Sequence, residues 1–141
     1  MSDPSNVDKI QRLWDTFDNS GFGSAMELIE ETFHPGVEFN PLEAAGAGGR
    51  TYRGQDGMLA FFGELGEAFE DVRFEPAQCH GVGEDVVVFT RMVGIAKQTG
   101  LPLRQDLSLV YEFSEGRVRC VTAYETPADA LEAAQRGHAD A

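Results

Sequence analysis

Basic residues are scarce in this sequence of 141 residues, which holds 11 lysines and arginines against 24 aspartates and glutamates. The formal net charge at pH 7 is therefore −13. A protein that binds nucleic acid needs a basic surface to neutralise phosphates, and an anionic membrane surface makes the same demand. We therefore expect neither nucleic acid nor a membrane among the partners, and we interpret the acidity as favouring solubility.

Long apolar runs and cysteines are also few. No run approaches the ~20 apolar residues that cross a bilayer. The first residues, MSDPSNVDK, lack the basic region and apolar stretch of a secretory signal. Cys79 and Cys120 are the only cysteines and do not form a Cys-x-x-Cys motif, which favours two reduced thiols. We therefore expect a cytoplasmic protein.

Patterns that hold metals or cofactors are missing as well. The histidines, His34, His80 and His138, have no metal-ligand spacing and no cysteine joins them. The glycine-rich stretch LEAAGAGG at residues 42–49 lacks the third glycine of a dinucleotide fingerprint, and no helix pattern opens there. We therefore expect neither a metal nor a cofactor.

What the sequence does contain is a helical first half. Apolar residues recur at helical spacing over residues 7–17 and again after Ser24, with NSGFG between the two patterns. A third helix is predicted from about Gln55 to Phe69. Near the end, TPADALEAA predicts a short helix with Thr126 as its cap and a proline at the first helical position.

Strand patterns dominate the second half. The stretch HPGVEFNP, residues 34–41, predicts a strand of five residues, with Glu38 and Asn40 on one face and Val37 and Phe39 on the other. Four β-rich runs follow the third helix, separated by short turns that imply antiparallel neighbours: VRFEPAQCH, DVVVFTRMVGIAKQ, LRQDLSLVYEF and RVRCVTAY.

A chain whose first half is helical and whose second half is a long β-meander has the pattern of the α+β class. Long strands twist and curl, and a curled sheet that side chains do not fill leaves a pocket. We therefore predict a cone-shaped, curved antiparallel sheet wrapped around three N-terminal helices, with a short C-terminal helix.

This succession resembles the nuclear transport factor two-like superfamily, and within it the SnoaL-like, ketosteroid-isomerase-like branch. The resemblance is carried by LWDTFDNSG, FHPGVEFNP, YRGQDGMLAFF, VVVFTRMVG and TAYETPADALEAA. It covers about residues 7–134 and implies one SnoaL-like domain over residues 1–141. It also implies helices against the concave face of the sheet and a homodimer through the outward face.

The same resemblance implies an orientation for the strands. In VVVFTRMVG the side chains of Phe89, Arg91 and Val93 are expected to point inward. In LRQDLSLVYEF the expected inward residues are Gln105, Leu107, Leu109, Tyr111 and Phe113.

Ketosteroid isomerases in this branch use a carboxylate base, a tyrosine and a protonated aspartic acid. Here these positions fall on Asn40, Trp14 and Leu109. An amide cannot accept a proton at neutral pH, so we do not expect steroid isomerisation by that mechanism.

Two other chemistries occur in the branch. In limonene-epoxide-hydrolase-like members the two aspartate positions fall on Gly94 and Ala123, so a base is missing unless Glu38 or Glu125 substitutes. SnoaL-type polyketide cyclases use an inward acid, and Glu38 is the best inward carboxylate under this interpretation.

The candidate site follows from these positions. A buried arginine needs a partner, and Glu38 is the expected partner of Arg91. The pair either orients the strand, or Arg91 holds a carboxylate or enolate oxygen while Glu38 moves a proton. The predicted catalytic residues are Glu38, Arg91 and Asn40, and the predicted substrate-binding residues are Trp14, Gln105, Phe61, Phe62, Phe89, Leu109 and Tyr111.

Three functions remain open at this point. The first is a cofactor-independent acid–base enzyme of the isomerase, cyclase or hydratase type, acting on a hydrophobic, oxygenated small molecule. The second is a non-catalytic module that binds such a molecule. The third is a protein-interaction domain that uses the outward sheet face, with self-association favoured because that face is polar.

Overall fold

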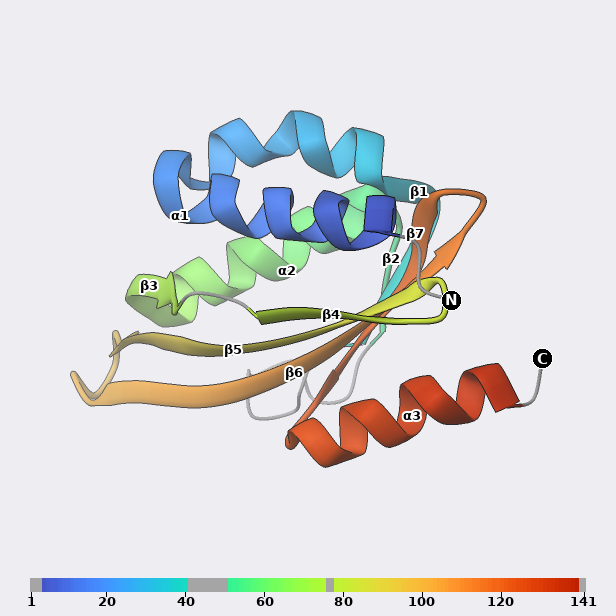
Figure 1. Cartoon of the computed structure of the whole chain (residues 1–141). Coiled ribbons are helices and arrows are strands. Elements are labelled where there is room, and N and C mark those ends of the chain that lie inside the picture. The colour runs from blue at the N-terminus through green and yellow to red at the C-terminus, as the bar shows by residue number, and fades with distance from the viewer. Residues whose placement is uncertain (1–3, 41–50, 76–77, 140–141) are drawn as a thin grey trace.

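The computed structural model describes residues 4–40, 51–75 and 78–139, with the side chains of residues 4–5, 17–28, 62 and 137–139 outside this description. The helices are α1 (Pro4–Thr32), α2 (Gly54–Ala68) and α3 (Pro127–Ala139). The strands are β1 (Phe33–Asn40), β2 (Tyr52–Arg53), β3 (Phe69–Phe74), β4 (Gln78–Val82), β5 (Asp85–Ala96), β6 (Pro102–Ser114) and β7 (Arg117–Tyr124). Figure 1 shows a curled sheet with helices on both of its faces, which confirms the predicted α+β class.

The strands form one sheet in the order β2-β1-β7-β6-β5-β3. The remaining strand, β4, also pairs with β5. The neighbours within the second half of the chain are antiparallel, as predicted. However, β1 runs parallel to β7, so the sheet is mixed and the purely antiparallel expectation is wrong. Short turns force antiparallel pairing, whereas a long connection that includes a helix permits a parallel pair.

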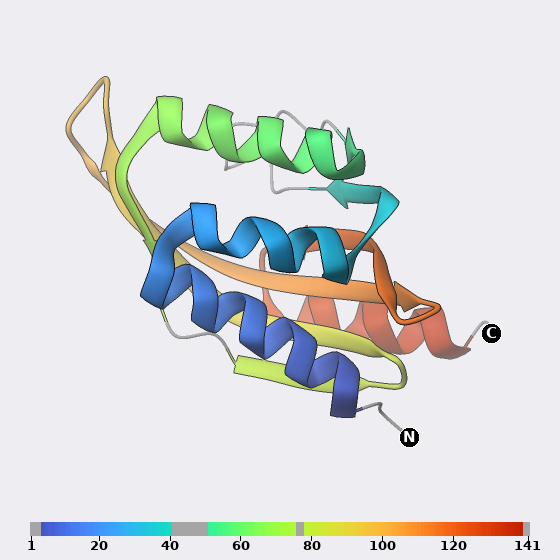
Figure 2. The same ribbon diagram turned by 90° about the horizontal axis from the view of Figure 1, so that it is seen from above.

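The first two predicted helices lie within one helical element, α1, which spans Pro4–Thr32. Its ribbon nevertheless changes direction sharply, so that the dark-blue and light-blue halves lie side by side (Figures 1 and 2). The two halves agree with the two predicted helical patterns, between which NSGFG lies in the sequence.

The inner face of the sheet is the face that α1 and α2 cover (Figure 1). Its core combines side chains from both helices with alternate residues of the long strands. The buried members include Ile10, Leu13, Trp14, Phe33, Val37, Phe39, Phe61, Val86, Val88, Met92, Leu107, Leu109, Tyr111, Phe113 and Val121. Leu107, Leu109, Tyr111 and Phe113 are four of the five inward residues predicted for β6, and their orientation is confirmed.

The outer face of the sheet is partly covered by α3 (Figure 2). Ala130 and Ala134 pack against Val87 and Val110 in a second, smaller apolar cluster. The backbone N–H of Asp129 donates to Thr126 Oγ1 at 3.1 Å, which confirms the predicted cap. A homodimer through the outer face stays a prediction, and α3 already occupies part of that face.

The predicted orientation of β5 is wrong by one residue. Val86, Val88 and Met92 point into the inner core, whereas Val87 and Phe89 pack in the α3 cluster on the outer face. Both faces of β5 are covered here, so its apolar residues are nearly continuous and do not alternate. Without alternation the side-chain period of two cannot show which residues face inward.

No helix in the described part of the chain is long and apolar enough to cross a membrane.

Candidate functional site

The first predicted site strand, β1, presents its apolar residues to the core. Val37 and Phe39 are buried there, and Phe39 packs edge-on against Phe61 with ring centroids 4.8 Å apart. Strand alternation therefore sends Glu38 and Asn40 to the outer face, opposite the helices. The expectation that these two side chains line an aromatic interior is wrong, because burying the apolar pair is the favourable choice.

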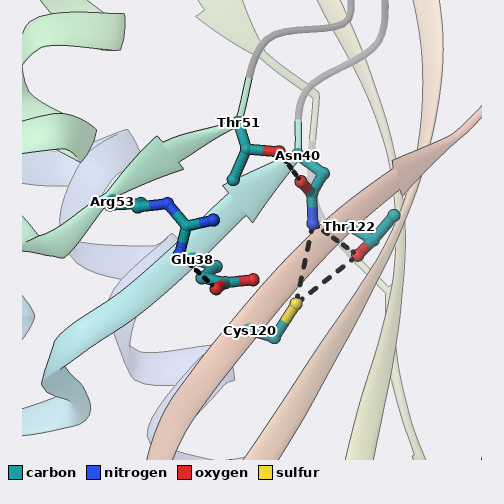
Figure 3. A network of polar contacts seen from close by, with 6 residues as sticks. All are labelled: Glu38, Asn40, Thr51, Arg53, Cys120 and Thr122. Carbon is teal, nitrogen blue, oxygen red and sulfur yellow. Dashed lines mark hydrogen bonds and ion pairs between the residues drawn. The ribbon is translucent and has the colours of Figure 1, made fainter.

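Glu38 pairs with an arginine, but not with the predicted one. Its Oε1 accepts a hydrogen bond from Arg53 Nη1 at 2.7 Å, and Figure 3 shows the two side chains meeting between β1 and β2. The register of these strands places Glu38 directly opposite Arg53. The side chains are 42% and 73% exposed respectively, so this is a surface ion pair.

We expect the Glu38→Gln variant to lower the free energy of unfolding by only about 0.2–1 kcal/mol, because exposed ion pairs are screened by solvent. Urea unfolding followed by circular dichroism measures the change, and Arg53→Gln is the matched control because it removes the same pair. A loss of several kcal/mol in either variant contradicts this prediction.

Asn40 has partners at both ends of its amide (Figure 3). Its Oδ1 accepts a hydrogen bond from Thr51 Oγ1 at 2.6 Å, and its Nδ2 lies 3.3 Å from Thr122 Oγ1 and 3.7 Å from Cys120 Sγ. Burial raises the pKa of Cys120, and the hydrogen bond with Thr122 partly opposes this. These contacts hold β1 to β7 through side chains as well as backbone.

Arg91 also lies on the outer face. Its Nε donates to Asp106 Oδ1 at 2.7 Å, and its Nη1 lies 3.4 Å from Glu75 Oε1. Asp106 is its direct neighbour in the β5–β6 register. The hydrogen bond to Asp106 and the two negative charges raise the pKa of Arg91. The predicted pairing of Arg91 with Glu38 is therefore wrong.

Two hollows adjoin this arginine cluster and together form what we call the outer groove. The larger has a volume of about 1000 Å³ and lies along β3, β5 and the start of β6. Its lining is Asp71, Val72, Arg73, Phe74, Glu75, Val93, Gly94, Ile95, Pro102, Leu103 and Arg104. The smaller, about 540 Å³, is lined by Arg91, Arg104, Gln105, Asp106, Glu125 and Thr126. Arg104 lines both.

The predicted substrate-binding residues separate into two groups. Trp14, Phe61, Leu109 and Tyr111 are buried in the inner core, with 5–7% of their surface exposed. Phe89 belongs to the outer face, where its ring lies 5.4 Å from that of His80. Gln105 lines the smaller hollow, although alternation with Leu103 and Leu107 places it on the inner face of β6. The side chain of Phe62 lies outside the described residues. The structure therefore does not gather the predicted set around one cavity.

Polar groups within the inner core come from residues on three elements. Tyr111 is buried, its ring stacks on Phe33, and burial raises the pKa of its hydroxyl while a hydrogen bond from Trp14 opposes the rise. Burial also raises the pKa of Cys79 to about 11, with a smaller contribution from Asp15. Trp14 packs edge-on against Phe74 at 5.1 Å. This cluster holds its protons at neutral pH.

The outer groove was not predicted. The sequence does not indicate a binding role for Arg73 or Ile95, because each is an ordinary residue of a strand pattern. Their association depends on the β3–β5 register, which shifts between Glu70 and Arg73. Asp71 in this irregular stretch has a φ of 55°. A strand run interrupted in this way cannot be aligned with its neighbour from sequence periodicity alone.

Comparisons with known proteins agree with this fold. Residues 10–121 match the family described as the SnoaL-like domain. Among curated proteins, none matches the chain.

Similar solved structures share the fold at low sequence identity. An NTF2-like protein of unknown function from Burkholderia pseudomallei is 18% identical, with a TM-score of 0.71 over 91% of this chain and 95% of that chain. A putative SnoaL-like polyketide cyclase from Jannaschia is 18% identical, with a TM-score of 0.71 over 94% and 92%. TerC co-crystallised with polyporic acid is 20% identical, with a TM-score of 0.69 over 93% and 98%.

Proposed function

The chain belongs to the SnoaL-like domain family, and on this basis we propose that it binds a small hydrophobic, oxygenated molecule in the outer groove without converting it. The co-crystallisation of the similar TerC structure with polyporic acid supports binding of a small organic molecule by this kind of fold.

The observation that carries the proposal is the larger hollow of the outer groove. Ligand sites occupy roughly 300–1000 Å³ and combine apolar walls with a few polar groups, and the hollow of about 1000 Å³ fits this description. Its wall includes Ile95, which is 37% exposed and, with Leu101, is one of the large hydrophobic side chains exposed in the described part of the chain. Covering such a side chain with a ligand is favourable.

The positions of the predicted catalytic residues favour binding over reaction. Acid–base catalysis needs a proton-transferring group within hydrogen-bond reach of the bound molecule. Glu38 is held by Arg53 on β1 and β2, and the strand order places β7 and β6 between β1 and β5. β7 therefore lies between β1 and β6, the nearest strand of the outer groove, and Glu38 does not line either hollow.

Fluorescence titration with the neutral dye Nile red tests the proposal. We expect saturable binding to the wild-type chain and a loss of at least about tenfold in affinity for Ile95→Asp, because a carboxylate in the apolar wall must be desolvated. Leu101→Asp is the matched control: Leu101 is 64% exposed and does not line either hollow. Thermal unfolding confirms that both variants are folded.

Equal binding by the two variants contradicts the proposed location. To test for conversion, extracts of hydrophobic metabolites are incubated with the protein and examined by mass spectrometry. Recovery of bound molecules unchanged supports a binding role, and the appearance of a new product that requires Glu38 supports the enzyme.

A further inference from the structure

The outer groove has an ordered arrangement of charge that follows from strand register. Val93 on β5 is the direct partner of Arg73 on β3 and of Arg104 on β6. The three residues therefore form a row across the sheet, with a small apolar side chain between two arginines. Neighbouring strands lie about 4.8 Å apart, which separates the two arginine Cα atoms by about 10 Å. Flexible side chains of this length can converge on one group above Val93.

All three side chains of this row lie on the outer face. Phe74, the residue after Arg73, packs against the inner core, and Met92, the residue before Val93, is buried in it. Alternation then sends Arg73 and Val93 to the opposite side. Leu103 packs against the inner core as well, which places its neighbour Arg104 on the outer face. Exposure agrees, because Arg73 and Arg104 are both exposed.

Two of the acidic groups in the outer groove are engaged by Arg91. In the adjoining row Arg91 binds Asp106 at 2.7 Å and Glu75 at 3.4 Å. By contrast, neither Arg73 nor Arg104 makes an ion pair with any residue of the described chain. Asp71 also lines the larger hollow and Glu125 the smaller one. The row itself thus carries two positive charges in a chain whose net charge is −13.

The next row toward the β5–β6 turn contains Glu70 on β3, Ile95 on β5 and Pro102 on β6. Ile95 and Pro102 line the larger hollow, whereas Glu70 is not among its lining residues. The outer groove therefore presents, in order along β5, an ion-paired row around Arg91, a row with two arginines around Val93, and the apolar side chains of Ile95 and Pro102, with Glu70 at the β3 end of this last row.

From this order we propose that the ligand is an anionic amphiphile, namely a small molecule with a carboxylate head and an apolar body. The carboxylate lies between the guanidinium groups of Arg73 and Arg104, which donate hydrogen bonds in the planar geometry that a carboxylate accepts. The apolar body covers Val93, Ile95 and Pro102. Repulsion from distant acidic residues is weak at physiological salt, where charges are screened within about 8 Å. This inference rests on the proposed binding function and adds the chemical class of the ligand.

The test uses naphthalene-2-carboxylate and its neutral methyl ester, which share an apolar body and differ in charge. Isothermal titration calorimetry measures both affinities for the wild-type chain, Arg104→Gln and Arg73→Gln. We expect each substitution to weaken carboxylate binding about tenfold, equal to about 1.4 kcal/mol, and to leave ester binding within twofold. Arg119→Gln is the matched control, because it changes the net charge equally from a position on β7.

The outcomes separate the two proposals. A selective loss of carboxylate affinity in the groove variants, absent from Arg119→Gln, supports the inference. Equal affinities for carboxylate and ester in the wild-type chain, or equal losses in all three variants, overturn anion recognition while leaving the binding function standing. Failure of the wild-type chain to bind either compound or Nile red overturns both proposals.

Discussion

Replacing Phe33 by alanine is expected to lower the free energy of unfolding by about 3–5 kcal/mol, the range for a large aromatic removed from a packed core. Phe33 is 1% exposed and stacks on Tyr111 with ring centroids 6.4 Å apart. It is also the first residue of β1, where its carbonyl accepts a hydrogen bond from Gln55 Nε2 at 3.1 Å. Its ring therefore joins the end of α1 to the sheet, and removing it leaves a cavity between them.

Urea unfolding measures this change, with Leu101→Ala as the control. Leu101 is exposed and its truncation is expected to change stability by no more than about 0.5 kcal/mol. A loss below about 1.5 kcal/mol for Phe33→Ala contradicts the packing described, since it implies that the surrounding side chains fill the space.

The second large effect is a loss of stability in alkaline solution that originates at Tyr111. Burial raises the pKa of its hydroxyl in the folded chain, whereas in the unfolded chain the pKa is about 10. Above pH 10 the unfolded chain therefore loses a proton that the folded chain keeps. Each further pH unit lowers the free energy of unfolding by up to about 1.4 kcal/mol, until the folded-state pKa is reached. Below pH 10 this group has no effect.

The Tyr111→Phe variant isolates this contribution. It keeps the ring that stacks on Phe33 but has no proton to lose, so its stability is expected to fall less steeply above pH 10. Cys79, whose pKa is raised to about 11, acts with the same sign and accounts for part of the remaining slope. Urea midpoints between pH 8 and 11.5 measure both chains, and parallel curves contradict the prediction.

The fold could be predicted to a large extent because its elements carry clear periodicity. In β6, polar and apolar residues alternate, and the inward set of Leu107, Leu109 and Tyr111 was predicted correctly. In β5, the run of Val86, Val87 and Val88 is buried at every position, and the orientation was missed. Alternation of polar and apolar residues identifies the inward face of a strand only where the other face is exposed to solvent. At β5, α3 covers the outer face, so the residues do not alternate.

The predicted site was less accurate because it depended on transferring positions from a family resemblance. That transfer placed Glu38 and Arg91 inward, whereas both belong to surface ion pairs on different parts of the sheet. The residues predicted as aromatic lining, such as Trp14 and Tyr111, are indeed interior. Aromatic character identifies buried positions reliably, but the partner of a charged residue depends on strand register, which the sequence does not show.

The parallel pairing of β1 with β7 has a consequence for the order of folding during synthesis. The β1 strand leaves the ribosome early, and the strand that flanks it on one side, β7, begins only at Arg117. Until then β1 has an open edge of backbone hydrogen-bonding groups, the kind of edge that recruits other chains. We therefore expect a chain truncated before Arg117 to aggregate, whereas the finished chain closes this edge with its last strand.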